Sequence, residues 1–352
     1  MRALTNPYRG TGLTWPGSEA IPSPSTDGAR PTALLARCPV AAETPLCDLP
    51  KLAADLGIAR IHLKDERDRM SLGSFKALGA AYVIAVDAEA GRARGQTYVT
   101  ASAGNHGLSV AAGAAAFGAN AQIFIADTVP ESFADRLRSL GAAVVRAGAT
   151  YEDSMRAAAQ TAKDHGSILL SDSSWPGYTD RPHRLMEGYL AMMDEVFAQI
   201  LEPPTHILLQ AGVGGLAGAA AAAARSEWAD GPRIIVVEPD AAPALAGSVS
   251  AGAPTAATGP VSAMGRLDCK EPSLIALKGL ARDADIFVAI TEAEGHEGAA
   301  LAARHGLPTT PSGAAGLSAL AVPGAGDALD LDADSRALVI LSEGPEDMAS
   351  ES

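Results

Sequence analysis

The sequence has few aromatic residues, few cysteines and no excess of positive charge. Aromatic side chains make up 4% of the 352 residues, which argues against an aromatic recognition surface and favours closely packed, backbone-lined pockets. The cysteines Cys38, Cys47 and Cys269 lack the spacing of metal ligands, so we expect bystander thiols and no metal site. The formal net charge of −14, without a basic stripe, argues against a nucleic-acid partner.

The sequence also shows no sign of a targeting segment or a membrane-spanning segment. The first residues do not combine a basic stretch, an apolar core and a cleavage site. The run of small residues at 211–224 is too short and too rich in glycine to cross a bilayer. We therefore expect a cytoplasmic protein with no membrane partner.

An alternation of short apolar strands with helices is present. The first ~35 residues are rich in Pro, Gly, Ser and Thr, and we expect an irregular arm there. Strands are predicted at 60–64, 98–100, 122–125 and 143–146, helices at 74–88, 108–117, 132–140 and 151–165, and a second series of strands at 168–170, 205–209, 233–237 and 337–341. The pattern predicts an α/β fold of two lobes, with open, mostly parallel sheets flanked by helices and a ligand in the cleft between them.

Lys76 stands among small and apolar residues in the segment 73–79, near the predicted start of a helix. Desolvation and the positive end of a helix both disfavour an ammonium ion, so the neutral amine should become accessible near neutral pH. A neutral amine can condense with an aldehyde. A lysine whose amine reaches the solvent is the alternative interpretation of this segment.

A glycine-rich turn, Gly212, Val213, Gly214, Gly215 and Leu216, follows a predicted strand and opens an alanine-rich helix. Glycines let backbone N–H groups converge on an anion, and the helix dipole favours negative charge there. The turn therefore predicts a phosphate site. The lack of a following Lys-Ser/Thr pair argues against a nucleotide P-loop, and tight packing is the other explanation for such a turn.

Two further strand-to-helix turns carry polar residues. In the first, Ser102 and the N–H groups of Ala103 and Gly104 could bind a carboxylate, while Asn105 could bind a phenolic oxygen. The second contains Ser312, whose hydroxyl could meet a pyridine nitrogen. Ordinary helix caps, with a structural rather than catalytic His106 beside Asn105, are the alternatives for these turns.

From Thr44 to Gly344 the order of these four elements resembles fold-type II pyridoxal-phosphate (PLP) enzymes, which include threonine and serine dehydratases and the tryptophan synthase β-subunit. The resemblance implies PLP as the cofactor, bound covalently at Lys76. It further implies that Asn105 contacts the O3′ of PLP, the turn 212–216 its phosphate and Ser312 its ring nitrogen. A homodimer is also implied, with a large PLP-binding domain of residues 1–77 and 166–352 and a small inserted domain of residues 78–165.

Segments 63–66, 172–179, 204–210 and 237–240 narrow the resemblance to diaminopropionate ammonia-lyase, the segment with Trp175 and Tyr178 being the most specific. This implies β-elimination on 2,3-diaminopropionate or a similar β-substituted small amino acid, giving a 2-oxo acid and ammonia. The alternatives are a dehydratase acting on serine, threonine or a 3-hydroxy amino acid, and a non-catalytic PLP-binding or ligand-sensing protein.

One position departs from the ammonia-lyase pattern. The bacterial pattern has an aspartate before Gly-Asn-His, associated with deprotonation of the D-isomer, where this chain has Ala103. The acid associated with the L-isomer matches Asp172, although a structural aspartate at a strand end is nearly as good an interpretation. We therefore predict Lys76 and Asp172 as the catalytic residues and a preference for L-substrates. The predicted substrate-binding residues are Ser102, Ala103, Gly104, His106 and Tyr178.

Overall fold

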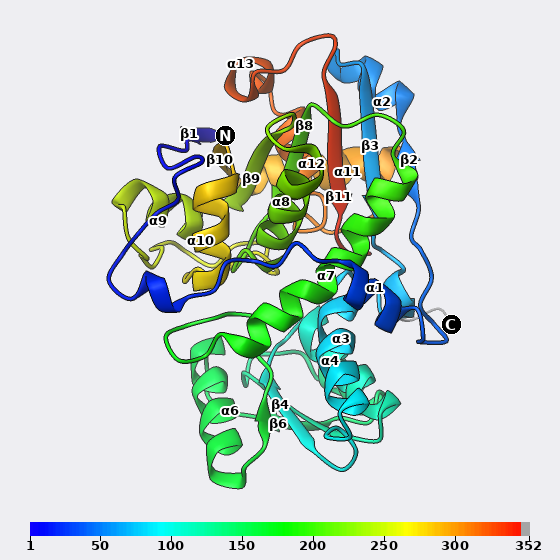
Figure 1. Ribbon diagram of the computed structural model, residues 1–352, viewed down its shortest axis with the longest axis vertical. Coiled ribbons are helices and arrows are strands. Elements are labelled where there is room, and N and C mark those ends of the chain that lie inside the picture. The colour runs from blue at the N-terminus through cyan, green and yellow to red at the C-terminus, as the bar shows by residue number, and fades with distance from the viewer. Residues whose placement is uncertain (346–352) are drawn as a thin grey trace.

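The computed structural model describes residues 1–345 and has two lobes, each built on its own sheet (Figure 1). The large sheet contains, in spatial order, β1 (Arg2–Thr5), β10 (Ile286–Ile290), β9 (Arg233–Pro239), β8 (His206–Gln210), β11 (Arg336–Leu341), β3 (Arg60–Asp65) and β2 (Leu46–Asp48). The small sheet contains β6 (Ala143–Arg146), β5 (Asn120–Ile125), β4 (Thr97–Ala101) and β7 (Ile168–Leu169). Only the edge strands β1 and β2 pair antiparallel among the described residues, so the predicted mostly parallel α/β fold is confirmed.

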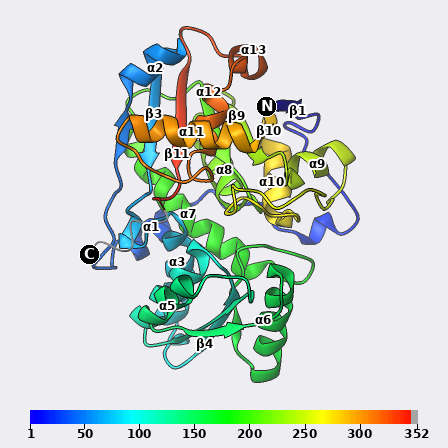
Figure 2. The same cartoon turned by 180° about the vertical axis from the view of Figure 1, so that it is seen from behind.

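Helices cover both faces of the large sheet, with α8 and α10 on one side and α11 and α12 on the other (Figures 1 and 2). The helices are α1 (Ala29–Leu35), α2 (Pro50–Leu56), α3 (Lys76–Glu89), α4 (Asn105–Ala116), α5 (Glu131–Ser139), α6 (Tyr151–His165), α7 (Asp180–Gln199), α8 (Gly215–Trp228), α9 (Ala244–Ala251), α10 (Leu274–Asp283), α11 (Glu292–Arg304), α12 (Ala315–Ala321) and α13 (Ala325–Leu329), with the short 3-10 helices η1 (Ser18–Ala20) and η2 (Arg69–Ser71). Within residues 1–345, none of them has the length and apolar character of a membrane-crossing helix.

The strands of the large sheet are apolar because both of their faces are buried. In β8, Ile207 and Leu209 belong to the core that contains α8, whereas Leu208 belongs to the core that contains α12. Strands covered on both faces are continuously apolar rather than alternating. This is why short apolar runs sufficed to predict β8, β9 and β11.

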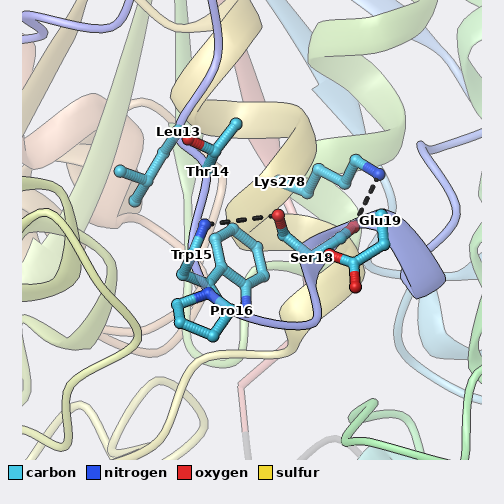
Figure 3. Close-up of a pocket in the computed structure, with 7 residues that line it drawn as sticks. All are labelled: Leu13, Thr14, Trp15, Pro16, Ser18, Glu19 and Lys278. Atoms are coloured by element: carbon cyan, nitrogen blue, oxygen red, sulfur yellow. Dashed lines mark hydrogen bonds between the residues drawn. The ribbon is translucent and has the colours of Figure 1, made fainter.

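The N-terminal arm is more ordered than the sequence suggested. Residues 2–5 form β1, which pairs antiparallel with β10, and α1 follows at residues 29–35. The amine of Lys278 on α10 donates hydrogen bonds to the carbonyl groups of Ser18 and Ile21. Figure 3 shows the surface hollow that this contact borders, lined by Leu13, Thr14, Trp15, Pro16, Ser18, Glu19 and Lys278. The prediction of an irregular arm was therefore wrong at β1 and α1, because β1 pairs with β10 and α1 packs on α3 and α7.

The strand β7 belongs to a different sheet from the one that its sequence suggested. The second series of strands was predicted to begin at residue 168, but β7 pairs with β4 of the small sheet, with Ile168 opposite Tyr98. The large-sheet series resumes only at β8. An apolar run of three residues predicts a strand but does not specify its partner. As a consequence, Asp172 lies in the loop after a strand of the small sheet, β7, whereas Lys76 lies after a strand of the large sheet, β3.

A buried ionic network holds the segment that leads to Lys76. The guanidinium of Arg69, 2% exposed, donates to Glu66 at 2.7 and 2.6 Å and to Glu195 of α7 at 2.7 and 2.7 Å. Lys64 binds the same Glu195 at 2.6 Å. Between this network and Lys76, Met70 and Ser71 have positive φ angles of 53° and 56°, which cost free energy in residues other than glycine. The network therefore stabilises a strained turn.

Replacing Arg69 by methionine should lower the free energy of unfolding by about 3–5 kcal/mol, because it leaves the fully buried Glu66 without its cation. Urea denaturation of the two proteins measures the difference. Arg138→Met, which removes exposed ion pairs to Glu131 and Asp135, is the control and should unfold at the wild-type urea concentration. Equal urea midpoints for Arg69→Met and wild type would contradict this role.

Candidate active site

Lys76 begins α3, and its amine meets a carboxylate that follows strand β7. The backbone N–H of Lys76 donates to Ser74 Oγ at 3.1 Å, which fixes the start of the helix. The side-chain amine lies 2.5 Å from Oδ2 of Asp172, which follows β7. The two predicted catalytic residues are therefore in direct contact, although they are far apart in the sequence.

The prediction that Lys76 would be neutral is wrong for this arrangement. Burial disfavours its positive charge, but the Asp172 carboxylate outweighs burial and raises the pKa of Lys76 above its usual value. Burial raises the pKa of the Asp172 carboxyl, but the charge of the Lys76 ammonium outweighs burial and lowers that pKa below its usual range. The pair therefore holds one proton on the amine and presents an ionised carboxylate beside it, and that proton can move when either group changes partner.

Tyr178 and His106 hold the backbone that carries Asp172. The Tyr178 hydroxyl accepts from the N–H of Ser171 at 3.0 Å and donates to the carbonyl of Leu169 at 2.9 Å. Nε2 of His106 donates to the carbonyl of Leu170 at 2.8 Å, and burial lowers the pKa of the imidazole, which keeps it neutral. Both side chains thus position Asp172, while their contact with a substrate stays a prediction.

Two positions of the glycine turn, Gly212 and Gly214, favour a residue without a Cβ atom. A Cβ atom at Gly212 would lie 2.9 Å from Sγ of Cys269 and 3.2 Å from the carbonyl oxygen of Arg266, and Gly214 has a φ of 95°. The first hydrogen bond of α8 joins the N–H of Gly218 to the carbonyl of Gly214 at 2.8 Å. The N–H groups from Gly215 to Ala217 therefore have no acceptor within the helix and are available to an anion.

Hydrogen bonds of Ser102 and Arg266 hold the loop 102–104 in place. Ser102 Oγ accepts from the N–H groups of Gly104 at 3.2 Å and Gly107 at 3.0 Å, as a helix cap does. Nη1 of Arg266 donates to the carbonyl of Ala103 at 3.2 Å. The side chain of Ala103 is exposed, so the position where the ammonia-lyase pattern has an acid faces open space.

Asn105 and Ser312 are connected through two residues that the sequence did not reveal. Asn105 Nδ2 and Thr310 Oγ1 donate to the two carboxylate oxygens of Glu343, which is 4% exposed. Nε of Arg266 lies 3.7 Å from the same carboxylate, and the backbone N–H of Arg266 donates to Ser312 Oγ at 3.2 Å. Glu343 follows the buried parallel strand β11, and this position was a usable signal. Arg266 lies in an irregular segment that gave none.

The sequence did not predict Cys269 as a residue of the site. It was interpreted as a bystander thiol, but its Sγ packs against the glycine turn. Burial raises the pKa of Cys269 to about 12, and the Asp172 carboxylate acts in the same direction while Lys76 opposes it. The thiol is therefore protonated at neutral pH and is a packing group between the turn and the ion pair.

The chain is similar to known proteins over nearly its whole length. A family model described as "Pyridoxal-phosphate dependent enzyme" matches residues 39–343. Diaminopropionate ammonia-lyase of Escherichia coli (strain K12) is 33% identical over 338 residues, covering 87% of this chain and 85% of that protein. The L-serine dehydratase/L-threonine deaminase of Bos taurus is 31% identical over 218 residues, covering 61% of this chain and 62% of that protein.

A solved structure supports the same relationship. The crystal structure of E. coli diaminopropionate ammonia lyase in complex with an aminoacrylate-PLP azomethine reaction intermediate matches with a TM-score of 0.86 and 29% identity. The match covers 99% of this chain and 94% of that chain. It therefore includes both lobes and the loops that connect them.

Proposed function

Because the chain belongs to the family of pyridoxal-phosphate dependent enzymes, we propose that it is an ammonia-lyase that converts L-2,3-diaminopropionate and water into pyruvate and two molecules of ammonia. The observation that carries this proposal is the 2.5 Å contact between the Lys76 amine and the Asp172 carboxylate. The similarity to diaminopropionate ammonia-lyase over 87% of the chain supports the choice of substrate.

The residues present fit PLP. When bound, the cofactor supplies an aldehyde for Lys76 and a conjugated ring that withdraws electrons from the substrate Cα. Asn105 donates one N–H to Glu343 and keeps a second for the phenolic oxygen. Ser312 Oγ already accepts the N–H of Arg266, so its own proton can be donated to the ring nitrogen. A hydroxyl donor there keeps the ring nitrogen unprotonated, which favours elimination over transamination.

Lys76 and Asp172 are the two groups that can move protons. Lys76 would hold the cofactor, and as a free amine it would accept a proton from the substrate Cα. Asp172 is ionised at neutral pH because its pKa is lowered, so it can also accept that proton. The configuration of the substrate decides which of the two faces the Cα hydrogen. In this proposal the turn at Ser102 binds the substrate carboxylate.

A dehydratase acting on serine or threonine is the second candidate. It is favoured by Ala103, which removes an acid that the ammonia-lyase pattern contains, and by the similarity to the bovine serine dehydratase over 61% of the chain. A catalytically silent PLP-binding protein is disfavoured, because the chain keeps the Lys76 and Asp172 pair in contact.

Product ratios distinguish these candidates. With L-2,3-diaminopropionate the protein should release two ammonia molecules per 2-oxo acid, whereas serine, threonine or 3-hydroxyaspartate would each give one. The visible absorbance of the bound cofactor should disappear on borohydride reduction, which fixes the cofactor covalently to the protein. Peptide mapping should then locate the attached cofactor at Lys76. A ratio of one with a hydroxy amino acid as the faster substrate would establish the dehydratase, and an unlabelled Lys76 would refute the site.

A further inference from the structure

Tyr189 on α7 carries a buried hydroxyl whose proton has no hydrogen-bond acceptor among residues 1–345. The residue is 1% exposed, and its ring contacts that of Phe75 edge to face with centroids 4.9 Å apart. A buried hydroxyl proton without an acceptor destabilises a folded chain, whereas phenylalanine would fill the same space without that penalty. A tyrosine at this position is therefore explained by a partner that is not part of the polypeptide.

The hydroxyl end of Tyr189 lies between Lys76 and the glycine turn. A Cβ atom at Gly79 of α3 would be 2.7 Å from Cε1 of Tyr189, and one at Gly215 would be 3.7 Å from Cε2. These two ring carbons flank the carbon that bears the hydroxyl. The hydroxyl end of the ring therefore lies between Gly79 of α3 and Gly215, the first residue of α8.

Lys76 does not accept the proton of this hydroxyl. Burial raises the pKa of Tyr189 above its usual value, and Lys76 opposes that shift through its positive charge and a hydrogen bond to the phenol oxygen, so the two groups are near each other. The ammonium has no lone pair and cannot accept from the phenol, and it already donates to Asp172. The phenol proton therefore remains available to an acceptor at the start of α8.

We infer that the Tyr189 hydroxyl donates a hydrogen bond to the phosphate group of the bound cofactor, alongside the backbone N–H groups of the glycine turn. The inference rests on the proposed function, because the phosphate arrives with PLP. A phosphate monoester offers several anionic oxygens, and a helix N-terminus with one neutral hydroxyl matches them without adding a charged side chain. Tyr189 is thus a cofactor-binding residue contributed by α7.

Comparing PLP with pyridoxal tests the inference, because pyridoxal lacks the phosphate. Tyr189→Phe should weaken PLP binding by about 10-fold or more and leave the affinity for pyridoxal unchanged. The phosphorus NMR resonance of bound PLP should also shift. A PLP affinity equal to wild type, or an equal loss for both ligands, would overturn the inference. Failure of the wild-type protein to bind PLP at Lys76 would instead overturn the proposed function.

The cofactor-free protein supplies a second, independent measurement. Tyr189→Phe should melt at or above the wild-type temperature, because it removes a buried hydroxyl whose proton has no acceptor. Tyr98→Phe is the matched control, since the buried Tyr98 hydroxyl donates to Asp87 at 3.0 Å in the small lobe. This control should melt lower than wild type and bind PLP with wild-type affinity. A lower melting temperature for cofactor-free Tyr189→Phe would show that the hydroxyl is structural and would reject the inference.

Discussion

Lys76→Ala should lower the rate of 2-oxo acid release by about 1,000-fold or more. The variant loses the only amine in contact with Asp172 among the described residues and one of the two groups that can accept the Cα proton. It should still bind PLP through the glycine turn, but borohydride should no longer attach the cofactor covalently to the protein. Steady-state assays on L-2,3-diaminopropionate, together with mass spectrometry of the reduced protein, measure both effects.

Lys76→Arg separates the charge of this residue from its chemistry. A guanidinium can keep an ion pair with Asp172, but it stays protonated and does not condense with an aldehyde. The arginine variant should therefore keep the stability of the cofactor-free protein while losing activity as Lys76→Ala does. Lys163→Ala on the exposed surface of α6 is the control and should be fully active. Activity within 10-fold of wild type in either Lys76 variant would show that another residue carries the reaction.

Local signals predicted much of the fold. The helix at 151–165 was predicted with its observed ends because Thr150 and Asp153 form a capping box and Gly166 ends the helix in the left-handed conformation. The start of α4 was predicted three residues late, because the N-cap residue Gly104 has no side chain and the capping hydroxyl comes from Ser102, two residues earlier. Strand β10 was not predicted at all. The sequence thus revealed elements that have their own start and stop signals.

The sequence indicated Lys76 and Asp172, which the structure brings into contact, but it did not indicate the electrostatics of the pair. Lys76, Asn105, Ser312 and the glycine turn follow local motifs, and a single sequence can show these. Lys76 and Asp172 are 96 residues apart, so no local pattern contains their ion pair, and the expected sign of the Lys76 pKa shift was therefore wrong. Tyr189 takes part through tertiary contacts that no spacing in the sequence encodes, whereas the position of Glu343 after β11 was a signal that was not used.

Asp172→Asn should slow elimination from L-2,3-diaminopropionate by about 100-fold or more, because it removes a carboxylate that can accept the Cα proton. It should also change the titration of Lys76. Without the negative charge, burial alone acts on the amine, so the pKa of Lys76 falls and the neutral amine appears at lower pH. The rate at which cofactor-free protein attaches PLP, measured against pH, should therefore rise at lower pH in the variant than in wild type.

Substitution at Ala103 tests whether the acid at this position determines stereochemical preference. The Ala103 side chain is exposed, so Ala103→Asp adds a carboxylate without displacing packed atoms. The double variant Ala103→Asp/Asp172→Asn has its carboxylate at position 103 instead of position 172. Its ratio of D- to L-isomer turnover should be about 10-fold or more above that of Asp172→Asn alone. Ala103→Ser, a polar residue that is not a base, is the control and should leave the ratio unchanged. Wild-type turnover of the D-isomer faster than the L-isomer would contradict the role of Asp172, since Ala103 supplies no acid.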